Sequence, residues 1–280
     1  MPEFSNTAFI DWPDAFENGA YIPGAAEMPA QWARDSQALR DQLSAAGRLD
    51  ADIAYGSDVR QCLDIARPEG QSQGLVVIVH GGYWHKFDKS LWTFLARGCL
   101  ARGWSVALPS YRLAPSVAMA EITQDIVDAV TFASQRVEGP IRLTGHSAGG
   151  HLVTRMLNED VPLASSILQR MVQVVPISGI YDLRPLLAHP MNEALRLDMD
   201  QATAESPALH APRTGTPLTL WVGAEERPEF LRQTRLLCER WSAQLPDTRG
   251  IYEPGKNHFS VIDALAETDS PLTECLLQSV

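Results

Sequence analysis

Two rhythms of apolar and polar residues run along this chain. Nearly continuous apolar runs such as 75–79 (Leu-Val-Val-Ile-Val) are typical of strands covered on both faces, and therefore of a mostly parallel sheet. Between these runs, apolar residues recur at helical spacing. We expect strands at 62–66, 75–80, 105–109, 141–144, 172–177, 218–222 and 250–253, and helices at 91–102, 118–136, 148–158 and 228–244.

This alternation predicts one α/β domain over residues 1–280 with a doubly wound, mostly parallel sheet. Residues 1–50 stand outside it: a stretch rich in Pro and aromatic residues, which we expect to wrap the surface, precedes a helix over 29–46. Residues 181–212 are irregular and are interpreted as an insertion that forms part of a cap. Right-handed crossovers would gather the carboxyl ends of the parallel strands, and with them the functional site, at one edge.

Composition narrows the classes of partner. The net charge of −11 argues against nucleic acids and anionic membranes, and no apolar run is long enough to span a bilayer. The start of the chain, residues 1–5, lacks a basic region followed by an apolar core, so we expect no signal peptide and a cytoplasmic protein. The four cysteines are scattered, without a C-x-x-C pair, and are expected to be reduced. A homodimer is compatible with the sequence, which does not set the oligomeric state.

One motif at a predicted strand end carries chemistry. Residues 145–149 read G-x-S-x-G and lie between the strand 141–144 and the helix that follows. A sharp strand-to-helix turn strains its central residue and tolerates only small neighbours, which explains Gly145 and Gly149. The hydroxyl of Ser147 would then stand at the carboxyl edge of the sheet, over a helix N-terminus, so Ser147 is the candidate nucleophile.

An activated serine needs hydrogen-bond donors for the oxyanion of its tetrahedral intermediate. The buried strand 75–80 runs directly into two glycines, whose backbone can approach a ligand closely. We expect the amides of Gly81, Gly82 and Tyr83 to form one side of an oxyanion hole and the amide of Ala148 to form the other.

The aromatic pair Tyr83-Trp84 follows these glycines. Both side chains could bind a substrate by stacking on an aromatic ring. The alternative is that Trp84 packs beneath the turn, and the sequence does not separate the two.

Seven histidines compete for the role of general base. His258 stands out because it follows the last predicted strand, and a loop there can bring an imidazole beside a serine at the middle of the sheet edge. His151 is close to Ser147 in the chain, but its ring is expected to point along the helix. The six less suitable histidines are His80, His85, His146, His151, His189 and His210.

The acid that orients the base is expected after the penultimate strand, in the chain order Ser, acid, His. The predicted strand 218–222 runs into the adjacent residues Glu225 and Glu226, where one carboxylate is needed. The other is expected to be a solvated charge at the start of the next helix. Asp182 is the fallback, although it is better suited to capping the helix after it.

With these pieces identified, the chain resembles the arylformamidase (kynurenine formamidase) branch of the α/β-hydrolases, over residues 55–265. The most specific element is His80-Gly81-Gly82-Tyr83-Trp84, where many carboxylesterases carry a third glycine. The other matching segments are 145–152, 178–183, 192–198 with 206–207, 228–230 and 257–259. The family's acid stands two residues before the Pro-Glu-Phe at 228–230, which matches Glu226, but the family usually has aspartate there and Glu225 stays open.

The resemblance implies an esterase/lipase-like α/β-hydrolase with a triad of Ser147, Glu226 and His258. It implies hydrolysis of N-formyl-L-kynurenine to kynurenine and formate, with no metal or organic cofactor, and thus a small aromatic formamide or ester as the partner molecule. Two other hypotheses stay open. One is a small-acyl carboxylesterase or another arylamide hydrolase with the same triad, and the other is a non-catalytic binding protein on the same fold.

Overall fold

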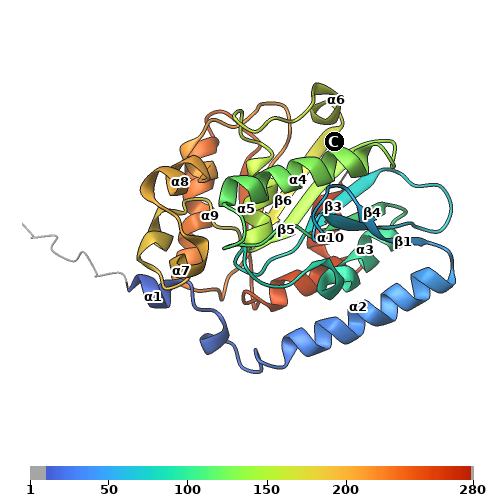
Figure 1. Ribbon diagram of the computed structural model, residues 1–280, viewed down its shortest axis with the longest axis horizontal. Helices are drawn as coiled ribbons and strands as arrows, with labels where there is room; N and C mark the ends of the chain where they lie inside the picture. The colour runs from blue at the N-terminus through green and yellow to red at the C-terminus, as the bar shows by residue number, and fades with distance from the viewer. Residues whose placement is uncertain (1–10, 279–280) are drawn as a thin grey trace, which may run out of the picture.

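The computed structural model describes residues 11–278 and is built on an eight-stranded sheet (Figure 1). Its strands are β1 Leu49–Ala54, β2 Cys62–Ala66, β3 Leu75–Val79, β4 Ser105–Pro109, β5 Ile141–His146, β6 Met171–Ile177, β7 Thr219–Gly223 and β8 Arg249–Glu253. They lie in the order β1-β2-β4-β3-β5-β6-β7-β8. The pairs β1–β2 and β2–β4 are antiparallel and the others are parallel, which confirms the expected mostly parallel sheet.

Helices cover both faces of the sheet (Figure 1). The α-helices are α1 Trp12–Ala15, α2 Met28–Ala45, α3 Ala96–Ala101, α4 Met119–Ser134, α5 Ala148–Arg155, α6 Ser165–Leu168, α7 Asn192–Leu195, α8 Met199–Ala204, α9 Pro228–Trp241 and α10 Pro271–Leu277. The 3₁₀ helices are η1 Gly19–Tyr21, η2 Lys89–Leu95, η3 Arg184–Ala188, η4 Pro207–Leu209 and η5 Ser260–Ala266. One core lies between the sheet and α4, α5 and α9, and the other between the sheet and α2, α3 and α10.

Strand β3 shows why its sequence is apolar at every position. Leu75, Val77 and Val79 belong to the core on one face, while Val76 and Ile78 belong to the core on the other. Side chains alternate between the faces of a strand, so a central strand covered on both faces has no position left for a polar residue.

Several elements differ from the expectation, including the unpredicted short helix α6. The predicted helix 91–102 is the 3₁₀ helix η2 followed by α3; its near-continuous apolar residues do not distinguish a period of 3.0 from one of 3.6. Strand β1 was not predicted because it is a largely exposed edge strand with a register shift between Asp50 and Ile53. Helix α10 was also missed, since it is too short to show a period.

Two segments outside the sheet pack against each other. Residues 181–212, expected to form part of a cap and called here the cap segment, contain η3, α7, α8 and η4 between β6 and β7. Residues 11–21, called here the N-terminal strap, contain α1 and η1 and lie beside the cap segment, where Phe16 meets His189 edge to face with ring centroids 5.7 Å apart (Figure 1). The prediction for residues 1–5 lies outside the described residues. Among residues 11–278, no helix combines the length and apolar character needed to cross a bilayer.

Candidate active site

Ser147 lies in the turn between β5 and α5 with a left-handed backbone, φ +55° and ψ −115°. Its amide donates to the carbonyl of Ile177 on the neighbouring strand over 2.8 Å. A Cβ on Gly145 would lie 2.5 Å from the oxygen of Gly149, and one on Gly149 would lie 2.0 Å from the oxygen of Val79. The two glycines of the motif are therefore required by close backbone approach on both sides of the serine.

The loop after β3, residues 81–84, packs directly against this serine and is called here the oxyanion turn. A Cβ built on Gly81 would lie 3.3 Å from the Cβ of Ser147. Gly82 and Tyr83 have left-handed backbones, with φ of +119° and +52°. Within residues 11–278, the amides of Gly82, Tyr83 and Ala148 donate no hydrogen bond, so these three donors have no partner in the described part of the chain.

Glu226 and His258 meet although 32 residues separate them in the chain. Glu226 follows β7, His258 follows β8, and Oε2 of the carboxylate lies 2.6 Å from Nδ1 of the imidazole. The other carboxylate oxygen accepts hydrogen bonds from the amide of Gly223, over 2.9 Å, and from the hydroxyl of Ser178. Glu225 is exposed to solvent. Of the two adjacent glutamates, Glu226 is therefore the one that contacts the histidine.

The contact with Glu226 fixes the tautomer of a neutral His258. A carboxylate only accepts, so Nδ1 carries the proton and Nε2 keeps its lone pair. The ring packs between His146 and Phe230, with centroids 4.5 and 4.4 Å away. Within the described residues, the hydroxyl of Ser147 makes no hydrogen bond to His258; such catalytic bonds are often long until a substrate binds.

Three other histidines near Ser147 are unsuited to act as bases. Burial lowers the pKa of His80 to about 4 and that of His151 to about 3. Burial, together with the neighbouring His258, holds the pKa of His146 well below its usual value. A group with so low a pKa accepts a proton poorly at neutral pH.

The position of Trp84 contradicts the prediction that its side chain stacks on a substrate ring. Its side chain has no exposed surface, and its indole Nε1 donates to Nδ1 of His151 over 3.1 Å. The ring packs beneath the oxyanion turn and presents no face to a substrate. The ring of His151, expected to point along its helix, instead bridges Trp84 and the backbone carbonyl of Glu205, 2.7 Å away.

Two further polar residues near the site are Ser178, for which no role was predicted, and Asp182, the fallback candidate for the acid. Ser178, which hydrogen-bonds Glu226, was not assigned a role. The available signal was its place in the matching segment 178–183, but a serine after a strand has no role visible without the partner strand. Asp182, the fallback acid, instead pairs with Arg184 and accepts from its amide over 3.1 Å. The expected capping role is wrong, because the N-cap of η3 is Leu183, which makes no side-chain cap bond.

The site is closely covered. Ser147 is 4% exposed and His258 is 3% exposed. Part of the cover is the N-terminal strap: the hydroxyl of Tyr83 donates to the carbonyl of Phe16 over 3.2 Å, and Nδ2 of Asn18 donates to that hydroxyl over 3.4 Å. Phe16 also packs edge to face on Phe230, with centroids 6.1 Å apart. The strap therefore rests on both the oxyanion turn and the aromatic neighbour of His258.

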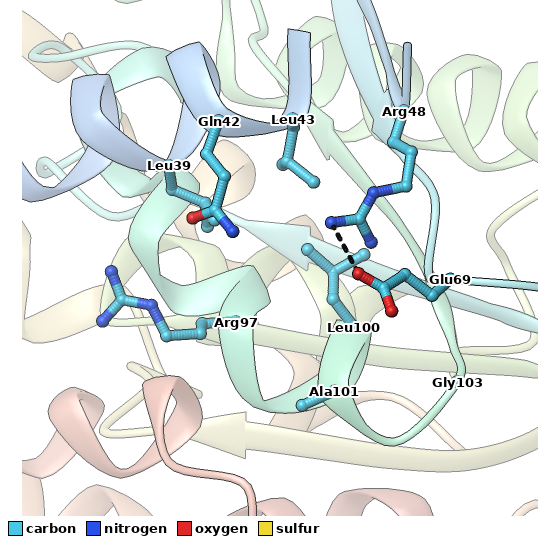
Figure 2. Close-up of a pocket in the computed structure, with 9 residues that line it drawn as sticks. All are labelled: Leu39, Gln42, Leu43, Arg48, Glu69, Arg97, Leu100, Ala101 and Gly103. Atoms are coloured by element: carbon cyan, nitrogen blue, oxygen red, sulfur yellow. Dashed lines mark ion pairs between the residues drawn. The ribbon is translucent and has the colours of Figure 1, made fainter. Parts of the chain in front are cut away.

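A separate hollow of about 350 Å³ lies between α2 and α3 (Figure 2). Arg48 and Glu69 form an ion pair at one side of it, 3.6 Å apart, and Gly103 in its lining lies two residues before the start of β4. The hollow is thus near the amino ends of the strands, whereas α/β folds bind ligands at the carboxyl ends. Its lining is Leu39, Gln42, Leu43, Arg48, Glu69, Arg97, Leu100, Ala101 and Gly103, which includes none of the predicted site residues.

The chain is similar to known hydrolases in sequence and in fold. The family model BD-FAE matches residues 63–225. A kynurenine formamidase from Salmo salar is 29% identical over 242 residues, covering 81% of this chain and 80% of the relative. A crystal structure from Silicibacter sp. TM1040, of a protein provisionally named a thioesterase, has a TM-score of 0.91 and 46% identity and covers 96% of this chain and 99% of that one. Esterase B from Lactobacillus rhamnosus, at 20% identity, TM-score 0.63 and coverage of 89% and 90%, shares the fold.

Proposed function

The chain belongs to the BD-FAE family and is a hydrolase with an α/β-hydrolase fold, and from that premise we propose that it is a serine-dependent arylformamidase. The substrate class is a small aromatic formamide, with N-formyl-L-kynurenine as the specific candidate. The observation that carries the proposal is the 2.6 Å contact between Glu226 Oε2 and His258 Nδ1, which leaves Nε2 of the histidine as an available base. The similarity to kynurenine formamidases supports the formyl group as the acyl part.

In the proposed first half-reaction, Oγ of Ser147 attacks the formyl carbon while its proton passes to Nε2 of His258. The carbonyl oxygen becomes an oxyanion, which accepts hydrogen bonds from the free amides of Gly82, Tyr83 and Ala148, with Gly81 allowing their close approach. Each such donor lowers the barrier by roughly 3 kcal/mol. Glu226 stabilises the imidazolium that forms without taking its proton.

The intermediate then collapses with cleavage of the carbon–nitrogen bond. His258 returns its proton to the leaving arylamine, and a formyl ester remains on Ser147. Water, deprotonated by the same imidazole, attacks this ester; the imidazolium then protonates Oγ of Ser147 as the ester bond breaks, which releases formate and the free serine. An arylamine leaves more readily than an alkylamine, so an esterase-type site suffices for this amide, and the steps need no metal or organic cofactor.

A second candidate is hydrolysis of small-acyl esters or thioesters with the same residues. The specific observation in its favour is the 46% identity to the protein provisionally named a thioesterase, which exceeds the identity to the formamidase from Salmo salar. The two candidates differ in the leaving group, not in the nucleophile. They are therefore separated by substrate preference.

The test has two parts. The first part measures kcat/KM for N-formyl-L-kynurenine, by formate detection, and for 4-nitrophenyl acetate and its thioester analogue. The ratio of the first value to each of the others decides the substrate class. We expect a ratio well above one, and a ratio well below one overturns the formamidase assignment. Ser147→Ala should abolish all these activities, whereas Ser166→Ala, at an exposed serine, should leave them unchanged. Retained hydrolysis in Ser147→Ala would overturn the serine mechanism itself.

A further inference from the structure

The indole of Trp84 and the imidazole of His151 form a buried pair that the proposed mechanism does not use. Neither side chain has exposed surface, and the rings meet edge to face with centroids 5.2 Å apart. Trp84 ends the oxyanion turn, and His151 lies on α5 one helical turn after Ser147. The pair therefore joins the two elements that carry the amides of the proposed oxyanion hole.

The hydrogen bonds of this pair allow one arrangement of protons. An indole N–H can only donate, so Nδ1 of His151 accepts and the ring's proton is on Nε2. That Nε2 donates to the backbone carbonyl of Glu205 over 2.7 Å. Burial lowers the pKa of His151 to about 3, which keeps the ring neutral at neutral pH. Both ring nitrogens and the indole nitrogen are thus satisfied.

The oxyanion turn requires such support because its backbone is strained. Gly82, Tyr83 and Trp84 have consecutive positive φ values of +119°, +52° and +58°. Non-glycine residues in this region are strained and persist only where their surroundings determine them. The carbonyl of Trp84 also accepts from the amide of Ala114 over 3.0 Å, which fixes the backbone at the end of the turn.

The far end of the pair is fixed as well. Glu205 is the C-cap of helix α8 in the cap segment, and its carboxylate accepts from the hydroxyl of Thr123 over 2.6 Å and from Nε of Arg155 over 3.2 Å. All three of these side chains are buried. His151 therefore links the indole beneath the turn to Glu205, which is itself held by buried hydrogen bonds.

We propose that Trp84 and His151 are positioning residues that hold the oxyanion turn in its left-handed conformation and anchor it to the cap segment through Glu205. The inference rests on the proposed function only in that the amides of the turn bind an oxyanion. It does not depend on the identity of the acyl group or of the leaving group.

The test compares 4-nitrophenyl acetate with its thionoester, in which sulfur replaces the carbonyl oxygen. Amide donors stabilise a developing oxyanion far better than a developing thiolate, so the ratio of the two kcat/KM values reports on the oxyanion hole specifically. The variants are Trp84→Phe, which keeps the aromatic ring and removes the donor, and His151→Leu, which removes both hydrogen bonds. The matched control is Thr154→Val, which removes a buried 2.7 Å hydrogen bond elsewhere on α5.

We expect Trp84→Phe and His151→Leu to lower kcat for the oxygen ester about 10-fold or more with little change in KM, and to lower the ester-to-thionoester ratio to a similar extent. The double variant should lose no more than the worse single variant, because both substitutions break one linkage. Thr154→Val should keep the wild-type ratio. Should His151→Leu fail to fold, Trp84→Phe decides.

An equal fall for both esters, or an unchanged ratio in a folded Trp84→Phe variant, overturns the positioning role. Additive losses in the double variant do the same. Failure of the proposed function looks different: either Ser147→Ala retains hydrolysis of the oxygen ester, or N-formyl-L-kynurenine is a poorer substrate than 4-nitrophenyl acetate. Neither result is read from the ester-to-thionoester ratio of these variants.

Discussion

Oε2 of Glu226 lies 2.6 Å from Nδ1 of His258, while the adjacent Glu225 faces solvent. If this contact orients the base, Glu226→Gln should lower kcat by roughly 10²–10⁴-fold, because an amide can present its NH₂ group to Nδ1 and favour the wrong tautomer. Glu225→Gln carries the same change of charge one residue away and should stay within twofold of wild type. Steady-state hydrolysis of 4-nitrophenyl acetate measures both. Equal losses in the two variants would refute the assignment of the acid to Glu226.

The close approach of Gly81 to the nucleophile gives a second prediction. A methyl group at this position would lie 2.9 Å from the carbonyl oxygen of His146 and 3.3 Å from the Cβ of Ser147. Gly81→Ala should therefore displace the oxyanion turn and lower kcat about 10- to 100-fold, since catalysis is sensitive to shifts of an ångström. Gly19→Ala, where an added Cβ meets nothing within 4 Å, is the control. Wild-type kcat in Gly81→Ala would show that the turn need not touch Ser147.

The packing of Phe16 on Phe230 predicts that the N-terminal strap affects both stability and substrate binding. Phe16 is 1% exposed, so Phe16→Ala should lower the free energy of unfolding by about 3–5 kcal/mol, as core Phe→Ala changes do. The loosened strap should raise KM for N-formyl-L-kynurenine more than KM for 4-nitrophenyl acetate, because the larger substrate needs more of the cover. Urea denaturation and initial rates test this, with Val59→Ala at an 89% exposed position as the control. Parallel changes in both KM values would argue against a role in selectivity.

Buried neutral histidines predict acid sensitivity. Burial lowers the pKa of His80 to about 4 and that of His151 to about 3, whereas a histidine in the unfolded chain titrates near pH 6.5. Below about pH 6.5 the unfolded chain therefore binds protons that the folded protein does not. Stability falls with decreasing pH, by about 1.4 kcal/mol per pH unit for each such histidine, until the folded-state pKa is reached.

Urea denaturation between pH 7 and pH 5 measures this slope while most carboxylates remain ionised. His80→Gln should reduce the loss of stability between pH 7 and pH 5 by about 2 kcal/mol, whatever its effect on the stability at pH 7. An unchanged slope in this variant would mean that His80 is not the buried neutral group described here.

Much of the site followed from local chemistry. The G-x-S-x-G turn could be placed because each glycine is demanded by backbone atoms that a strand-to-helix turn always brings close, here the oxygens of Gly149 and Val79. His258 could be selected because it follows the last strand. The parallel strands were visible because double-sided burial leaves a continuous apolar run, as in β3.

Residues whose role depends on a distant partner could not be resolved in this way. Ser178 acquires its role only when β6 and β7 lie side by side and bring it to Glu226. Trp84 could equally have faced a substrate or the core, and the acceptor that holds it inside, Nδ1 of His151, lies on another element. The contact of the strap with Tyr83 joins residues 67 positions apart.

The sequence by itself determined the parallel sheet, the serine at its carboxyl edge and the chain order of the proposed nucleophile, acid and base, because these depend on periodicity and on turn geometry that act within a few residues. Only the tertiary structure decided between Glu225 and Glu226, turned Trp84 from a candidate substrate contact into buried support, and laid the strap over the site. Adjacent side chains point in different directions, and which of them meets a partner depends on how segments far apart in the chain pack together.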